Sequence, residues 1–129
     1  MLLTWSDEFS VKIKELDEHH RKIFSILNRL FEEINKGSHS RVVLEVLTDL
    51  DEYASYHFQA EEELFRKKNY PDAQEHMREH EVFRAHQRKL DELVRMNDKL
   101  AGLELSEFLS SWLISHVLTT DKKYIPFLT

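Results

Sequence analysis

Apolar residues recur along this chain at alternating intervals of three and four, the spacing of one face of an α-helix. The pattern predicts four long helices, over residues 17–36, 40–68, 71–100 and 104–120, preceded by an arm over residues 1–14. The stripe along the first helix consists of Leu16, Ile23, Leu27, Leu30 and Ile34. No β-strand is expected, so the fold class is all-α.

Turn-forming residues are scarce and lie between the predicted helices. The expected turns are Gly37-Ser38, Asn69-Tyr70-Pro71-Asp72 and Ala101-Gly102. Asp17 is a candidate N-cap of the first helix, and Ser38 or Ser40 of the second. Four amphipathic helices with short connections favour an antiparallel up-down-up-down four-helix bundle. We therefore expect one domain over residues 1–129.

Six polar residues interrupt the apolar stripes at positions that should point inward. They are His20, His57, Glu61, His76, His80 and His116. In an up-down-up-down bundle, the starts of the first and third helices share one end with the ends of the second and fourth helices. All six residues therefore converge in one or two adjacent layers. Because buried carboxylates and unpaired imidazoles are costly, this convergence indicates a metal site.

The spacing within each helix supports shared ligation. His57 and Glu61 are i,i+4 neighbours, as are His76 and His80, so each pair lies on one face about 6 Å apart along the axis. Asp121 is a further candidate ligand, but in a straight helix it would lie about 140° from the face of His116. Asp121 can point inward only if the fourth helix ends or bulges near residues 119–120.

Other histidines and acids of the chain receive ordinary interpretations. His19 is adjacent to the stripe of its helix, His86 lies beside another stripe, and His39 falls in a turn. Glu62 and Glu63 extend the acidic run that begins at the preceding glutamate, and we expect them to form a solvated face. None of these five residues is predicted to bind a metal.

The residue types narrow the choice of metal. Imidazole and carboxylate ligands suit iron, zinc, copper or nickel, whereas calcium and magnesium are poor candidates. The chain has eight histidines and no cysteine, which excludes thiolate sites. Seven candidate ligands exceed one tetrahedral zinc ion, so two ions are expected. An HExxH motif is absent, since Arg84 stands where its second histidine would be.

Charge and hydropathy exclude other classes of function. Eighteen basic against 24 acidic residues give a net charge of −6, and the pI is about 5.7. A nucleic-acid or anionic-membrane binder needs a basic face. No apolar run approaches the ~20 residues of a membrane span, and the first residues do not resemble a signal peptide. We therefore expect a cytoplasmic monomer that binds no nucleic acid.

The polar segments resemble the hemerythrin family, most closely its single-domain bacteriohemerythrins. The segments are Asp17-Glu18-His19-His20, His57-Phe58-Gln59-Ala60-Glu61-Glu62, His76-Met77-Arg78-Glu79-His80 and Trp112-Leu113-Ile114-Ser115-His116, followed by Asp121 and Tyr124. The resemblance covers nearly the whole chain, and all seven ligand positions hold the expected residue type.

This resemblance implies a non-haem centre of two iron ions with a bridging oxo or hydroxo group. By that pattern His76, His80 and His116 hold one iron, His20 and His57 hold the other, and Glu61 and Asp121 bridge both. One coordination position then stays open on the two-histidine iron, where O2 would bind. The resemblance places Phe58, Trp112, Leu113 and Val117 around that position.

The expected function is reversible O2 binding for O2 transport, storage or delivery, without enzymatic turnover. A reductase or an O2-consuming enzyme is a candidate partner. Two alternatives use the same site: sensing of O2 or iron through a partner protein, and a di-iron oxidase or scavenger of peroxide or nitric oxide. A metal-free helical scaffold is a further alternative.

Overall fold

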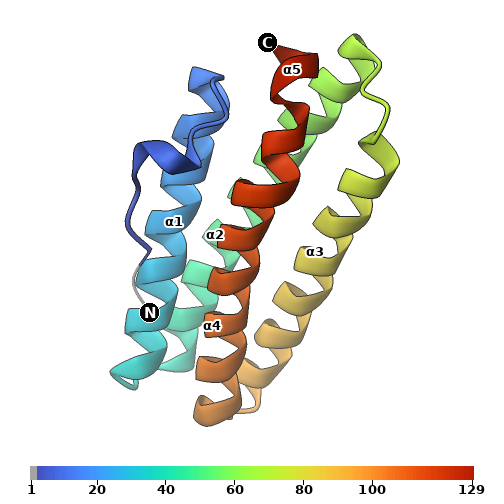
Figure 1. Ribbon diagram of the computed structural model, residues 1–129. Helices are drawn as coiled ribbons and strands as arrows, with labels where there is room; N and C mark the ends of the chain where they lie inside the picture. The colour runs from blue at the N-terminus through green and yellow to red at the C-terminus, as the bar shows by residue number, and fades with distance from the viewer. Residues whose placement is uncertain (1–2) are drawn as a thin grey trace.

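Four long helices lie side by side in the computed structural model, which describes residues 3–129 (Figure 1). They are α1 (Lys14–Asn35), α2 (Ser40–Lys68), α3 (Ala73–Arg95) and α4 (Lys99–Ser115). Successive helices run antiparallel, and α4 closes the bundle by packing against both α1 and α3. No strand occurs within the described residues, so the predicted all-α up-down-up-down bundle is confirmed.

The N-terminal arm packs along α1. Its predicted range begins with Met1 and Leu2, which lie outside the described residues. The Leu3 amide donates to Asn28 Oδ1 at 2.7 Å, and Asn28 Nδ2 donates back to the Leu3 carbonyl at 2.8 Å. The arm contains the short helix η1 (Asp7–Phe9). The Phe9 ring packs edge-on against Phe24 of α1, with ring centroids 5.0 Å apart. The arm is therefore part of the core.

The first helix begins earlier than predicted, and Asp17 is not its N-cap. The cap position is Ile13, while Asp17 lies inside α1. Its carboxylate accepts the Val11 amide at 2.8 Å and the Ser10 hydroxyl at 2.6 Å, so it binds the arm instead of the helix end. Gly37, with φ +76°, ends α1 as expected because glycine adopts this conformation without a steric penalty.

The turn between α3 and α4 differs from the prediction. The third helix does not reach residue 100, because Asn97 adopts a left-handed conformation with φ +57°. The Asp98 side chain then caps α4 by accepting the Ala101 amide at 3.2 Å. The predicted turn at Ala101-Gly102 is therefore wrong. Gly102 lies within α4 and is buried, facing Ile34 of α1 and Leu90 of α3.

The second helix has the predicted bounds but a different cap. Neither Ser38 nor Ser40 caps it; His39 holds the cap position, and its side chain accepts the Arg41 amide at 3.0 Å. After α4 the chain continues without a loop through a π-helical turn η2 (His116–Thr120), a 3-10 helix η3 (Asp121–Tyr124) and α5 (Ile125–Leu128).

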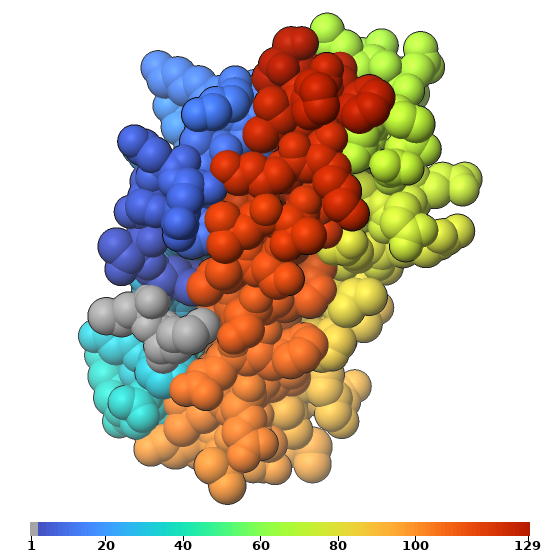
Figure 2. Space-filling view, in the orientation of Figure 1, coloured from blue at the N-terminus to red at the C-terminus, as the bar shows by residue number. Residues whose placement is uncertain are grey.

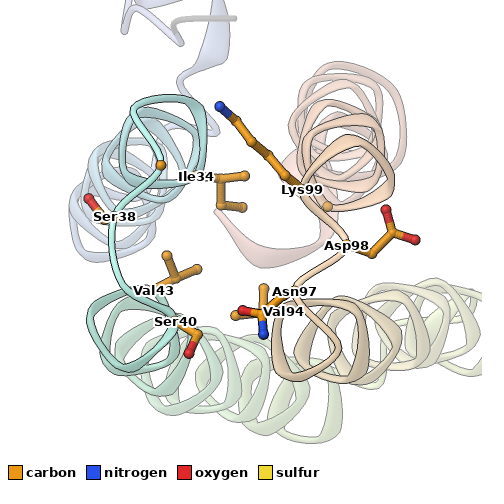
Figure 3. Close-up of a pocket in the computed structure, with 10 residues that line it drawn as sticks. Ile34, Ser38, Ser40, Val43, Val94, Asn97, Asp98 and Lys99 are labelled. Atoms are coloured by element: carbon orange, nitrogen blue, oxygen red, sulfur yellow. The ribbon is translucent and has the colours of Figure 1, made fainter.

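The two ends of the bundle differ in chemistry. A cavity of about 200 Å³ opens at the end formed by the α1–α2 and α3–α4 turns, with Ile34, Val43 and Val94 directed into it (Figure 3). Its other lining residues are Gly37, Ser38, Ser40, Asn97, Asp98, Lys99 and Gly102. The six inward-facing polar residues predicted from the sequence lie at the opposite end. None of the helices between residues 3 and 129 has the length and apolar character of a membrane span.

Candidate metal centre

The seven predicted ligands meet at the end of the bundle where α1 and α3 begin and α2 and α4 end. They are His20, His57, Glu61, His76, His80, His116 and Asp121, and none is more than 3% exposed. On the face shown in Figure 2, the C-terminal segment after α4 lies between the arm and the start of α3. Lys122 fastens this segment by donating to the Ser10 carbonyl at 2.8 Å.

Two groups of potential ligands can be distinguished within the cluster. Three histidines (His76, His80 and His116) form one group with Glu61, and two histidines (His20 and His57) form the other with Glu61 and Asp121. In each group the potential ligand atoms lie within 4.8 Å of one another. Glu61 belongs to both groups. Asp121 also reaches both, since its Oδ1 lies 3.0 Å from the Nε2 atoms of His76 and His116.

The ligand atoms are close together but are not hydrogen-bonded to one another. Glu61 Oε1 lies 3.1 Å from His80 Nε2, and Asp121 Oδ2 lies 3.1 Å from His20 Nε2. In the part of the chain that the structure describes, these four atoms have no hydrogen-bond partner. They are thus buried polar atoms that lie close together with their hydrogen-bonding capacity unused. This donor set, imidazole nitrogens with carboxylate oxygens, suits transition-metal ions, iron among them.

Burial and neighbouring charges shift the pKa values of the carboxylates and imidazoles in the cluster. Burial alone would raise the pKa of Glu61 and Asp121, but the surrounding imidazoles hold both well below the usual range. Burial lowers the pKa of His57 to about 4. Burial also opposes the charge of His76 and His116, yet the two carboxylates raise these pKa values to about 9 and about 10. Without a metal, protonated imidazoles therefore balance the buried acids.

The π-helical turn brings Asp121 into the cluster. A regular helix would direct Asp121 about 140° away from His116, but the wider turn of η2 lets His116 Nε2 and Asp121 Oδ1 approach to 3.0 Å. The condition set by the sequence is therefore met, because α4 ends at Ser115 and the π-helical turn continues to Thr120. Glu79 of α3 holds both ends of this turn. It accepts from His116 Nδ1 at 2.8 Å and from the Thr120 hydroxyl at 2.8 and 2.9 Å.

The outer nitrogens of three imidazoles contact residues that the sequence pattern did not single out. His80 Nδ1 donates to Glu62 at 2.9 Å, so Glu62 is not simply part of a solvated face. His57 Nδ1 lies 3.0 Å from Nδ1 of His19, which is only 4% exposed and whose pKa is lowered by that burial. His116 Nδ1 donates to Glu79, as described above.

A sequence signal for these outer residues exists. His19, Glu62 and Glu79 each stand directly beside a predicted ligand in the chain. In a bundle such positions flank the inward stripe and face the neighbouring helix. By contrast, His39 and His86 are ordinary, as expected: the first caps α2, and the second stacks on Phe108 with ring centroids 4.5 Å apart.

Tyr124 contacts the carboxylate that both groups share. Its buried hydroxyl donates to Glu61 Oε2 at 2.7 Å. Burial and the nearby carboxylates raise the pKa of Tyr124 well above 10, so the phenol keeps its proton. Tyr124 can therefore orient the Glu61 carboxylate without adding charge.

Two of the four predicted pocket residues contact histidines of the cluster. Phe58 stacks on His80 with ring centroids 3.9 Å apart, and Trp112 stacks on His116 at 4.6 Å. Trp112 therefore contacts the three-histidine group, whereas Phe58 contacts both groups, since its ring centroid also lies 5.9 Å from that of His57. Leu113 and Val117 are buried one helical turn apart, on either side of His116 in the chain.

Known proteins share both the sequence pattern and the architecture. A family model for the hemerythrin HHE cation binding domain matches residues 11–128. The chain is 29% identical over 130 residues to a bacteriohemerythrin of Clostridium acetobutylicum, covering 96% of this chain and 99% of that protein. It is 32% identical over 120 residues to a hemerythrin-like protein of Naegleria gruberi, covering 93% and 88%.

The structural comparison agrees with the sequence comparison. The crystal structure of a wild-type hemerythrin superposes with a TM-score of 0.89 at 28% identity, covering 99% of this chain and 98% of that chain. The ligand types, the bundle and the family match thus coincide over nearly the same residues. This chain belongs to the hemerythrin HHE cation-binding domain family.

Proposed function

We propose that this protein binds O2 reversibly at a pair of iron ions and serves O2 transport, storage or delivery. One observation carries the proposal: two buried groups of potential ligands share Glu61, and their ligand atoms converge without hydrogen-bonding to one another. All seven proposed ligands come from one chain, so the centre needs no second subunit and a monomer suffices.

Each group of ligands has a separate role in this proposal. His76, His80 and His116 would hold one ion, and His20 and His57 the other, with Glu61 and Asp121 between them. A bound iron pair supplies the electrons and the open coordination position that O2 needs. With three histidines for one ion and two for the other, the open position would lie on the two-histidine side.

The surrounding residues favour binding over turnover. Neutral imidazoles donate less negative charge than a carboxylate-rich shell, which disfavours the high-valent iron that oxidation of a substrate requires. Phe58, Leu113 and Val117 are each at most 2% exposed. We infer that these apolar side chains limit the access of water and protons, with Trp112 beside them, and so protect the oxygenated state.

Reconstitution tests the proposal directly. Two equivalents of Fe(II) are added per chain without oxygen, air is admitted and then purged, and visible absorption is followed. We expect a coloured species that forms in air and disappears on purging, with about two irons per chain by elemental analysis. The variant His86→Ala, altered outside the cluster, serves as the control and should behave identically.

Two results would contradict the proposal. Iron retention far below two ions per chain would remove the centre itself. Sustained consumption of a reductant with O2 or peroxide would instead favour the di-iron oxidase or scavenger. In the carrier role, the partner would be a reductase that restores an oxidised centre, or an enzyme that uses the delivered O2.

A further inference from the structure

The outer contacts of the imidazoles divide the centre into two unequal halves. In the three-histidine group, His80 Nδ1 contacts Glu62 at 2.9 Å and His116 Nδ1 contacts Glu79 at 2.8 Å. A carboxylate that accepts the outer N–H of an imidazole makes the inner nitrogen a stronger ligand. Two of the three histidines on this side are therefore strengthened by negative charge.

The two-histidine group has a different kind of outer contact. His57 Nδ1 lies 3.0 Å from His19 Nδ1, and this pair is enclosed by protein. The Nδ1 atom of His20 is buried and has no partner between residues 3 and 129. The outer contact found on this side is thus made by an imidazole, where the other side uses carboxylates.

The chemistry of the two rings decides the direction of their hydrogen bond. His57 Nε2 faces the cluster, 3.4 Å from Glu61 Oε1, so a metal bound there requires the hydrogen of His57 to be on Nδ1. His19 Nδ1 must then accept this hydrogen and carry none itself. A neutral His19 consequently has its own hydrogen on Nε2, which lies 3.9 Å from the exposed Glu15 carboxylate.

Aromatic neighbours hold His19 in this position. The ring of Tyr53 packs edge-on against His19 with centroids 5.9 Å apart, and the ring of Tyr56 lies at 5.0 Å. Both tyrosines come from α2, the helix that also carries His57. Because the His19 ring is carried by α1 and packs against these two rings of α2, it lies beside the outer nitrogen of His57.

Building on the proposed function, we propose that His19 is a positioning residue for the iron on the two-histidine side. It accepts the Nδ1 hydrogen of His57 and so aims His57 Nε2 at the metal. Because His19 contributes no negative charge, His57 remains a weaker electron donor than His80 and His116. The protein thereby keeps its two metal positions electronically unequal, with the weaker ligands on the side where the open position lies.

The hydrogen positions can be measured in the zinc-loaded wild-type protein. Zinc is diamagnetic, so 15N-labelled imidazoles can be assigned to their tautomers by long-range 1H–15N correlation spectra. We expect His57 with hydrogen on Nδ1 and His19 with hydrogen on Nε2. Hydrogen on Nδ1 of His19 would overturn the inference. This measurement requires no variant to fold and no reaction with O2.

Metal titration of variants provides the second test. In calorimetric titration with Zn(II), His19→Leu should lower the affinity for the second equivalent of zinc by about 10- to 100-fold, because His57 loses its hydrogen-bond acceptor. His19→Gln offers an amide oxygen as an acceptor and should bind the second equivalent far more tightly than the leucine variant. His86→Leu removes a histidine that does not contact the cluster and is the matched control.

A third variant separates positioning from charge. His19→Glu offers a carboxylate to His57, and in the iron-loaded protein it should lower the reduction potential relative to His19→Gln. Equal potentials in these two variants, or wild-type zinc affinity in His19→Leu, would overturn the inference while leaving the proposed function intact. Failure of the wild-type protein to bind two metal equivalents would overturn the proposed function itself.

Discussion

Buried charge at single residues governs the chemistry of this protein. Glu61 is fully buried, and its two oxygens are treated differently. Oε2 accepts a hydrogen bond from Tyr124, while Oε1 faces the imidazoles without a hydrogen-bond partner in the described chain. The first interaction orients the carboxylate, and the second leaves an oxygen available to a metal.

Replacing Tyr124 with phenylalanine removes the hydroxyl that donates to Glu61. A hydrogen bond to a charged group contributes about 1.5–3 kcal/mol. We expect Tyr124→Phe to lower the free energy of unfolding of the metal-free protein by about this amount, measured by urea denaturation at pH 7. Tyr56→Phe, at an exposed position, should leave it nearly unchanged. Equal stabilities of the two variants would contradict the assigned role.

Replacing Leu113 with asparagine tests the apolar pocket. A polar side chain beside the cluster admits water and protons, so Leu113→Asn should shorten the lifetime of the oxygenated protein several-fold. The decay of its visible absorption provides the measurement. Leu113→Met keeps the site apolar and should preserve the lifetime. An unchanged lifetime in the asparagine variant would count against placing Leu113 at the O2 position.

At the scale of secondary-structure elements, irregular backbone brings the site together. The π-helical turn η2 rotates Asp121 inward, and Glu79 ties both ends of this turn to α3. Such turns are uncommon and are often found at functional sites. At the other end of α4, a glycine inside a regular helix lines the cavity of Figure 3.

The hydroxyl of Thr120 is expected to stabilise the π-helical turn. Thr120→Val keeps the shape of the side chain but removes both hydrogen bonds to Glu79. Asp121 should then be held less firmly, and metal affinity should fall by about tenfold in a calorimetric titration with Zn(II). Thr119→Val, at the exposed neighbouring position, is the matched control. Equal affinities would show that Thr120 does not position Asp121.

The two glycines of the chain should respond oppositely to substitution. A Cβ at Gly102 would lie 3.9 Å from Ile34 and 4.0 Å from Leu90, which is ordinary contact within the cavity. Gly102→Ala should therefore raise stability by about 0.5–1 kcal/mol. Gly37→Ala should lower it, because φ is +76° there. Thermal unfolding measures both, and destabilisation by Gly102→Ala would refute the expected fit.

At the scale of the whole molecule, metal and fold are linked through protons. One end of the bundle is packed with apolar side chains, while the other balances acids against imidazoles. Metal ions can replace the protons of those imidazoles, because imidazole nitrogens must be unprotonated to bind a metal. The pH dependence of stability should therefore differ between the metal-free and metal-loaded protein.

The metal-free protein should lose stability in alkali. His76 and His116 have pKa values of about 9 and about 10 in the fold, above the ordinary 6.5. Their contribution is complete below pH 6.5 and is lost as the pH rises through the folded values. We expect the urea midpoint of the metal-free protein to fall between pH 7 and 10.

The zinc-loaded protein provides the control for this pH dependence. Its imidazoles are already unprotonated, so its urea midpoint should change much less over the same range. In acid, by contrast, the zinc-loaded protein should lose its metal, because the ligands become protonated. Parallel pH profiles for the two forms would contradict the assignment of His76 and His116 as proton-carrying ligands.

The amino-acid sequence by itself determined the all-α bundle, the shared end of its polar residues and the condition that Asp121 required a bulge. These follow from periodicity and helix order, which are local properties of the chain. The expected turn at Gly102 was wrong, because a glycine inside a helix cannot be distinguished by its local sequence from one that ends a helix.

Only the tertiary structure decided which side chains support the cluster. The contacts of His19, Glu62 and Glu79 join residues 38, 18 and 37 positions apart in the chain. Such contacts depend on the rotation of one helix against its neighbour, which the spacing within a helix does not specify. Local periodicity thus encodes which residues face inward, while helix packing decides which residues contact the outer nitrogens of the inward-facing histidines.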